Sequence, residues 1–330
     1  MSTPELDRSR AVRAERRREI AVVGPTASGK SALALRIARA ARSAGVGDVE
    51  LVCVDAMTVY RGLDIGTAKP TASERAEFIH HGLDLAEVEQ PVTMVDVADA
   101  CRAALDDIAR RGAAAVIVGG TGLHLRAVID GLDPPGSWPE LRAELEALAA
   151  RGSSALAALY EELQASDPIA AERIDPANAR RIVRALEVCR GSGRPFTSFG
   201  PGLGEYRIDS VRQLAISWSR EQLGVRIAQR IAGQVEAGWL PEVEAMWPRL
   251  GPTAVQVIGY RELHEHLTGG RSLDDALGAV VLRTRQFAVR QERWFRRDPR
   301  ITWYSPDDGE SAVASVIEAW SDPGAGNAGH

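Results

Sequence analysis

The chain has 330 residues and a formal net charge of −5 at pH 7, and 45% of its residues are hydrophobic. This length and composition allow a sizeable buried core, either as one large domain or as a core with a smaller additional unit. No apolar run approaches the roughly 18 residues that cross a bilayer. The three cysteines, Cys53, Cys101 and Cys189, are far apart and form no CxxC pair. We therefore expect no membrane span, no disulfide framework and no zinc site. We expect a cytoplasmic protein.

Both ends of the chain predict flexible tails. Residues 1–19 carry several arginines, but no apolar stretch follows this basic start, so the segment is expected to be a basic tail and not a secretory signal. Residues 322–330 are rich in Gly and Ala and predict a second flexible tail.

Strands and helices alternate in the first part of the chain. The apolar strand patterns are short, and Thr93 with Asp96 forms a capping-box pattern before the second helix. The expected strands are 19–23, 51–54 and 113–118, and the expected helices are 32–44 and 93–111. This alternation, with glycine at the ends of elements, is typical of a doubly wound α/β sheet.

The loop after the first strand matches the P-loop pattern G-x-x-x-x-G-K-[ST] in full, as Gly24-Pro25-Thr26-Ala27-Ser28-Gly29-Lys30-Ser31. Successive backbone N–H groups and the following helix N-terminus would bind a diphosphate or triphosphate. Lys30 would add a point charge, and Ser31 could ligate Mg²⁺. The motif specifies the class of ligand but no reaction.

From residue 134 to about 204 the strand signals disappear and short helical patterns follow one another. They lie at 139–150, 153–164, 167–173 and 176–189. A returning strand is expected at 211–218, then helices at 221–237, 241–250 and 273–297 and a last strand at 301–304. The predicted fold class is therefore α/β: a P-loop NTPase-like parallel sheet core formed by 20–133 and 205–321, with an inserted helical domain at 134–204 and a helical C-terminal part.

Polar residues follow the second and third strands. Asp55 stands at the carboxyl end of a strand, where an open α/β sheet presents its ligand site. Facing a P-loop, it could bind a metal ion or accept a proton from a nucleophile; alternatively, it is a helix cap or a turn former. Gly119-Gly120-Thr121-Gly122 forms a second turn, where backbone and hydroxyl groups could approach a phosphate. Between these segments, 61–70 is a glycine-broken polar loop.

The basic residues are almost all arginine. Of 40 basic residues only Lys30 and Lys69 are lysine, which indicates that a compact point charge is needed at these two positions. Arginine runs lie within 180–194 and 283–300. They could be solvated helix faces or contacts to nucleic-acid phosphates, because local charge matters more for such contacts than the negative net charge.

These motifs resemble the bacterial tRNA dimethylallyltransferases, the IPP transferase family. The resemblance covers roughly 20–304 in the family's order, through the P-loop and the segments 55–70, 119–123, 181–188, 258–262 and 284–291. The D-x-G-T-A-K-P stretch at 64–70 is especially specific, because ordinary P-loop kinases lack it.

The resemblance implies transfer of a dimethylallyl group from dimethylallyl diphosphate to N6 of adenine 37 in the tRNA anticodon loop, with release of diphosphate. The diphosphate would lie on the P-loop with Mg²⁺ as cofactor at Ser31. Asp55 would be the general base, and Lys30, Thr121 and Arg230 would complete the catalytic set. The implied contacts to tRNA are Asp55, Ala56, Met57, Thr58, Arg180, Arg181, Ile182, Val183, Arg184, Gln256, Gly259, Tyr260, Arg261 and Arg285. We expect a monomer that docks the anticodon stem-loop on the helical insertion, away from any membrane.

Four positions depart from the family pattern: Ala56 stands where Ser is common, Thr58 where Gln is common, His124 for a frequent Tyr and Val289 for a frequent Lys. The first two bear on contacts to the adenine. None of the four removes the phosphate site or the candidate base.

Three other functions share parts of this pattern. A P-loop nucleotide kinase would need a compact arginine-rich lid, but the chain has a helical insertion of about 70 residues instead. An isoprenyltransferase acting on free AMP, ADP or ATP would share the P-loop and Asp55 but would not need an arginine-rich insertion. An RNA-binding regulator with a vestigial P-loop would not need an intact Lys30, Ser31 and Asp55.

Overall fold

The structure is a computed structural model that describes residues 18–132, 135–199, 206 and 211–321. The described residues form two compact units, one made of 18–130 with 211–321 and the other of 131–132 and 135–199 with 206. Most of the expected N-terminal tail and all of the expected C-terminal tail lie outside the described residues. Arg18 and Glu19 are described, and Glu19 begins the first strand.

The larger unit is built on a six-stranded sheet in which all strand pairs are parallel, with the order β3-β2-β4-β1-β5-β6. Its strands are β1 (Glu19–Val23), β2 (Val49–Val54), β3 (His80–His81), β4 (Ala114–Gly119), β5 (Arg212–Ile216) and β6 (Ile301–Tyr304). The chain leaves β1 at the centre of the sheet and moves first to one side and then to the other. The expected α/β class with a parallel sheet is confirmed.

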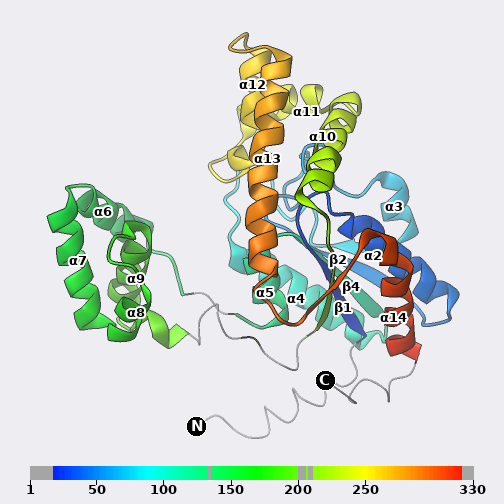
Figure 1. The fold of residues 1–330 in the computed structure, drawn as a ribbon, viewed down its shortest axis with the longest axis horizontal. Coiled ribbons are helices and arrows are strands. Elements are labelled where there is room, and N and C mark those ends of the chain that lie inside the picture. The colour runs from blue at the N-terminus through cyan, green and yellow to red at the C-terminus, as the bar shows by residue number, and fades with distance from the viewer. Residues whose placement is uncertain (1–17, 133–134, 200–205, 207–210, 322–330) are drawn as a thin grey trace, which may run out of the picture. The chain divides into compact units, whose positions relative to one another are not determined.

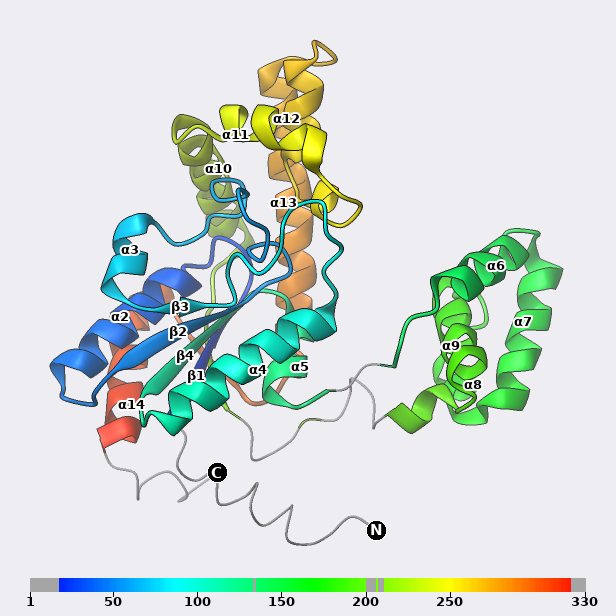
Figure 2. The same ribbon diagram turned by 180° about the vertical axis from the view of Figure 1, so that it is seen from behind.

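Helices cover both faces of this sheet (Figures 1 and 2). One face carries α2 (Lys30–Ser43) and α14 (Gly309–Ser321), and the other carries α4 (Met94–Arg110) and α5 (Gly122–Ile129). The core under α2 and α14 is a continuous apolar cluster that includes Ile37, Val116, Leu214 and Trp320. Burial on both faces explains why the central strands are apolar throughout.

Further helices stand beyond the edge of the sheet at which the strands end (Figure 1). They are α10 (Arg220–Glu236), α11 (Trp239–Met246), α12 (Tyr260–Leu267) and α13 (Leu273–Phe295). The remaining elements of this unit are α3 (Ala72–Glu77), which precedes β3, and the 3₁₀ turns η2 (Trp247–Arg249), η3 (Ala254–Gln256) and η4 (Pro306–Asp308). α10 and α13 pack against each other. These elements build walls around the carboxyl ends of the strands.

The smaller unit is helical and has its own core. Its elements are α6 (Pro139–Ala149), α7 (Ser153–Ser166), α8 (Pro168–Arg173), α9 (Ala179–Ser192) and η1 (Phe196–Phe199). Leu145, Leu163 and Leu186 are fully buried in its apolar cluster. The buried carboxylate of Glu187 accepts hydrogen bonds from the Trp138 backbone N–H and the Arg142 guanidinium, which fixes the start of α6 against α9.

Several elements were not predicted from the sequence: β3, α3, α5, α12 and α14. β3 has two polar residues and no apolar pattern, and α3 buries none of its side chains. α3 is instead stabilised by a capping box between Thr71 and Glu74, a local pattern that the sequence does contain. The capping box at Thr93 and Asp96 was predicted and is confirmed.

Candidate active site

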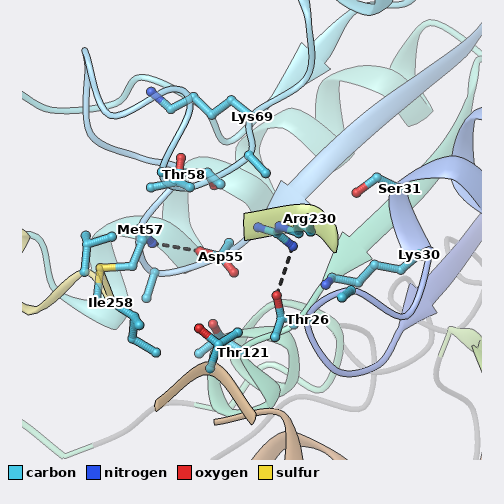
Figure 3. Close-up of a pocket in the computed structure, with 18 of the residues that line it drawn as sticks. Thr26, Lys30, Ser31, Asp55, Met57, Thr58, Lys69, Thr121, Arg230 and Ile258 are labelled. Carbon is cyan, nitrogen blue, oxygen red and sulfur yellow. Dashed lines mark hydrogen bonds between the residues drawn. The ribbon is translucent and has the colours of Figure 1, made fainter. Parts of the chain in front are cut away.

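A cavity of about 530 Å³ opens at the carboxyl ends of β1, β2 and β4. Its lining comes from the P-loop, the residues after β2, the 66–70 loop, α10, the 256–258 loop and α13. Figure 3 shows Asp55 and Thr121 reaching into it from the strand ends. Lys30 and Ser31 lie on the α2 side, and Arg230 appears between Asp55 and these two residues. The structure thus brings the four expected catalytic residues to one cavity.

The P-loop presents unpaired backbone donors to this cavity. Among the described residues, the N–H groups of Gly29, Lys30 and Ser31 have no hydrogen-bond partner, and α2 has no acidic residue in its first turn. The positive end of the α2 dipole therefore adds to these donors. Such an arrangement binds an anion, and its size suits phosphate groups.

Two arginines of α10 donate hydrogen bonds to the P-loop. Arg226 donates to the Ala27 carbonyl (2.8 Å) and stacks on Trp218, whose indole N–H donates to the Ser28 carbonyl (2.9 Å). Arg230 donates to the Thr26 hydroxyl (2.9 Å) and lines the cavity. The resemblance implied a contact from one arginine of 226–230, and Arg230 was chosen with Arg226 as the alternative. Trp218 was not predicted, because no local pattern marks a contact made 190 residues along the chain.

Lys30 is partly buried between the P-loop and the end of β4. Its ammonium lies 3.4 Å from the Pro25 carbonyl, and a Cβ at Gly120 would lie 3.3 Å from Nζ, so a larger residue at 120 would displace the lysine. Burial, with the neighbouring charge of Arg230, lowers the pKa of Lys30 to about 8, although Asp55 opposes this shift. The cavity therefore concentrates positive charge that an anionic ligand would stabilise.

Asp55 forms a turn with one carboxylate oxygen and lines the cavity with its side chain. Its Oδ1 accepts a hydrogen bond from the Met57 N–H (2.9 Å), which makes it a turn former. Among the described residues, its Oδ2 has no hydrogen-bond partner, and the side chain lines the cavity. One oxygen thus fixes the carboxylate and the other is available to a ligand.

Gln291 of α13 joins the P-loop to the turn after β4. Its Oε1 accepts from the Thr26 N–H (2.8 Å) and its Nε2 donates to the Gly120 carbonyl (2.8 Å). This contact spans 265 residues, and Gln291 was not predicted as a site residue. Thr121 lies in this turn as the N-cap residue of α5 and makes no capping bond with its hydroxyl, which leaves that hydroxyl available in the cavity.

The expected tRNA contacts fall into two groups. In the larger unit, Ala56, Met57, Thr58 and Gln256 line the cavity with Asp55. Gly259 and Tyr260 are buried, Arg261 is exposed, and Arg285 donates to the Gly224 carbonyl of α10 (3.3 Å). The remaining candidates, Arg180 to Arg184, lie on α9 of the smaller unit.

Burial divides the α9 candidates. Ile182 and Val183 belong to the core of the smaller unit, so their side chains do not face solvent. Arg184 donates to the Pro135 carbonyl (2.8 Å) and lies against Glu187, which gives it a structural role. Arg180 and Arg181 are exposed, and their guanidinium groups have no partner among the described residues. They are the members of this group that can reach a phosphate.

Replacing Arg180 and Arg181 together by Ala should weaken binding of an anticodon stem-loop and flatten its salt dependence. Each lost phosphate contact should reduce the slope of log K against log salt by about 0.7–0.9. The measurement is a salt titration of the dissociation constant, with Arg151→Ala, an exposed arginine at the end of α6, as the control. A double variant with the slope of the control would assign both arginines to a solvated helix face.

Lys69 has a structural role. Its side chain is 1% exposed, and its ammonium donates to Asp64 (2.7 Å), Asp84 (2.6 Å) and the Tyr60 carbonyl. In Figure 3 it is directed away from Asp55. The compact charge that the sequence indicated at this position therefore ties the 61–70 loop together.

Among the described residues, no group of three His, Cys, Asp or Glu side chains could hold a metal ion. No helix in the same residues combines the length and the hydrophobicity needed to cross a membrane.

A parallel sheet with a P-loop after its central strand, β1, and an acidic side chain after β2, which β4 separates from β1, defines an α/β protein of the P-loop type. A family profile described as IPP transferase matches residues 58–298. The tRNA dimethylallyltransferase of Paenarthrobacter aurescens is 45% identical over 300 residues, covering 90% of this chain and 94% of the relative, and that of Acidothermus cellulolyticus is 42% identical over 311 residues, covering 92% and 94%. The crystal structure of the full-length tRNA isopentenylpyrophosphate transferase of Bacillus halodurans is 31% identical, with a TM-score of 0.63 and coverage of 92% of this chain and 98% of that one. The chain belongs to the IPP transferase family.

Proposed function

We propose that the protein transfers the dimethylallyl group of dimethylallyl diphosphate to N6 of adenine 37 in the anticodon loop of tRNA. The observation that carries this proposal is one cavity that holds both a phosphate site and an available carboxylate oxygen, on Asp55. Membership of the IPP transferase family and the names of the relatives support the choice of donor and acceptor. A tRNA substrate also supports the expectation of a cytoplasmic protein.

In this reaction the N6 nitrogen attacks the allylic carbon, a C–N bond forms, and the C–O bond to the diphosphate breaks. The amine is a poor nucleophile because its lone pair is delocalised into the adenine ring. Asp55 accepts the proton that N6 loses, which removes the positive charge developing there. The P-loop amides, Lys30 and Arg230 stabilise the negative charge that grows on the departing diphosphate.

The residues present fit a magnesium ion in the phosphate site. Among the described residues, the Ser31 hydroxyl has no partner and lines the cavity beside the P-loop amides. Mg²⁺ is commonly held by one or two protein oxygens with phosphate oxygens and water, so the absence of a cluster of ligands among those residues is compatible with it. When bound, the ion would neutralise charge on the leaving diphosphate.

The acceptor distinguishes this proposal from prenyl transfer to free AMP or ATP. A polynucleotide docks through several phosphates, and these contacts supply the energy needed to move the target base out of its stack. A mononucleotide offers almost none of that binding energy. We therefore expect N6-modified adenosine to form on an anticodon stem-loop about 100-fold faster, or more, than on AMP at equal concentration.

The test incubates the protein with dimethylallyl diphosphate, Mg²⁺ and either acceptor, and quantifies the modified nucleoside by mass spectrometry. Comparable rates on AMP and on the stem-loop would favour the mononucleotide transferase. Hydrolysis or transfer of the γ-phosphate of ATP, without prenyl transfer, would favour a kinase.

A further inference from the structure

One carboxylate outside the reacting groups holds a wall of the cavity. Glu242 of α11 accepts hydrogen bonds from three consecutive backbone amides, those of Asp64 (2.8 Å), Ile65 (2.7 Å) and Gly66 (2.9 Å). Its Oε1 also accepts from the hydroxyl of Tyr260 (2.5 Å). Three amides converging on one carboxylate form an anion nest that is filled by a side chain of the protein itself.

The turn at 64–66 is held on its other side as well. Gln234 of α10 donates from Nε2 to the carbonyls of Ile65 (2.5 Å) and Gly66 (3.1 Å). A Cβ at Gly66 would lie 2.4 Å from Trp239 Nε1, so only glycine fits between the turn and α11. The backbone of this turn is therefore fixed through both its donors and its acceptors.

The residues that follow this turn face the phosphate site. Gly66, Thr67 and Ala68 line the cavity, and Ala68 also lines the opening beside the P-loop together with Gly29 and Arg226. Ala68 has a φ of 51°, a backbone conformation that a residue with a Cβ keeps only when its surroundings enforce it. A loosened turn would release this conformation and move the wall opposite the P-loop.

The same carboxylate also reaches a second wall. Tyr260 is fully buried and begins α12, directly after the 256–258 loop that lines the cavity. Burial and the nearby charge of Glu242 raise the pKa of Tyr260, so its hydroxyl stays protonated and donates to Glu242. Glu242 thus links the turn at 64–66 to the start of α12.

We propose that Glu242 is a positioning residue that holds the 64–68 segment across from the P-loop and thereby sets the affinity of the site for the diphosphate of the donor. It touches no reacting atom and acts through the backbone of the turn. The inference rests on the proposed function for the identity of the donor, but the hydrogen-bond geometry that carries it does not.

The test variant is Glu242→Gln, which keeps the size of the side chain. In glutamine one of the two carboxylate oxygens is replaced by an NH₂ group. That group faces at least one of the backbone N–H groups and cannot accept a hydrogen bond from it. We expect the KM for dimethylallyl diphosphate to rise about tenfold, since a charge-assisted hydrogen bond to a partly buried group is lost, while the KM for the stem-loop changes less than twofold. Glu242→Asp keeps the charge and should restore part of the affinity.

The matched control is Glu244→Gln, which makes the same change at an exposed carboxylate of the same helix, α11. It should leave the donor KM within threefold of wild type. Binding of inorganic pyrophosphate with Mg²⁺, measured by calorimetry, gives a readout that needs no prenyl transfer: it should weaken in Glu242→Gln alongside the donor KM. Pyrophosphate affinity equal to that of wild type, or equal rises in both KM values, would overturn the proposal. A wild-type protein that binds pyrophosphate but transfers no prenyl group would refute the proposed function and leave this binding test in force.

Discussion

Asp55→Asn should lower the rate of prenyl transfer from bound substrates by about 10²–10⁴, the range for a lost general base. The substitution is selective because the structure gives the two carboxylate oxygens different tasks. An asparagine still accepts the Met57 N–H through Oδ1 and keeps the turn after β2, while its NH₂ group cannot take a proton. Binding of the stem-loop should therefore change little.

The measurement is a single-turnover rate constant at saturating donor, with the stem-loop dissociation constant determined separately. Asp55→Ala serves as the comparison, since it removes the base and the bond to Met57 together. It should add a binding defect that Asp55→Asn lacks. If Asp55→Asn instead loses stem-loop binding and reacts normally once bound, Asp55 is only a turn former.

All strands of the sheet except β3, and most of the helices, follow from local patterns in the sequence. β1 and β6 begin and end at the expected residues because both are mostly apolar or aromatic and Gly24, Pro299 and Pro306 mark turns beside them. α12 was missed because it is short and follows the irregular segment at 251–259, whose conformation depends on contacts with Trp239 and with the residues before Gln90. Such segments acquire their structure from tertiary packing, which local periodicity does not encode.

Site residues that belong to a local sequence motif could be predicted. Residues that contact the site from a distant part of the chain were harder to predict. The P-loop, Asp55 and Thr121 each follow a predicted strand. Because the carboxyl ends of parallel strands meet at one edge of a sheet, their location in one site could be predicted. Gln291 and Trp218 contact the P-loop from α13 and from the segment before α10, and nothing near them in the sequence indicates those contacts. Their roles needed the structure.

The arginine run on α9 contained a signal that could have been used. Ile182, Val183 and Leu186 recur at the helical spacing of a buried face, so the exposed positions beside them could be inferred. Arg184 could not be separated in this way, because its structural role depends on carbonyls about 50 residues away.

Lys30→Met should reduce prenyl transfer by at least about 10²–10³, the effect of losing one donor that stabilises charge developing in a transition state. Methionine keeps the length and the apolar stem of lysine, so the packing against Gly120 should survive. The fold is tested by a melting curve, which should show no loss, because the variant removes a buried charge whose pKa the site depresses. Turnover within threefold of wild type would contradict a role of Lys30 on the leaving group.

The pH dependence of pyrophosphate binding tests the same lysine without chemistry. The pKa of Lys30 is about 8 in the site without ligand, so the charged form that attracts phosphate is complete below this pH and is lost above it. Binding above pH 8 must therefore be accompanied by proton uptake, and the affinity should fall by up to about tenfold per pH unit until the pKa of the complex is reached. Calorimetry in buffers of different ionisation enthalpy counts the protons taken up on binding.

Two variants serve as controls. Lys30→Arg stays charged over this range and Lys30→Met stays neutral, so both should lose the proton uptake seen in wild type. Any pH dependence of binding that they retain belongs to pyrophosphate itself. Equal proton uptake in wild type and in both variants would assign the titration to another group.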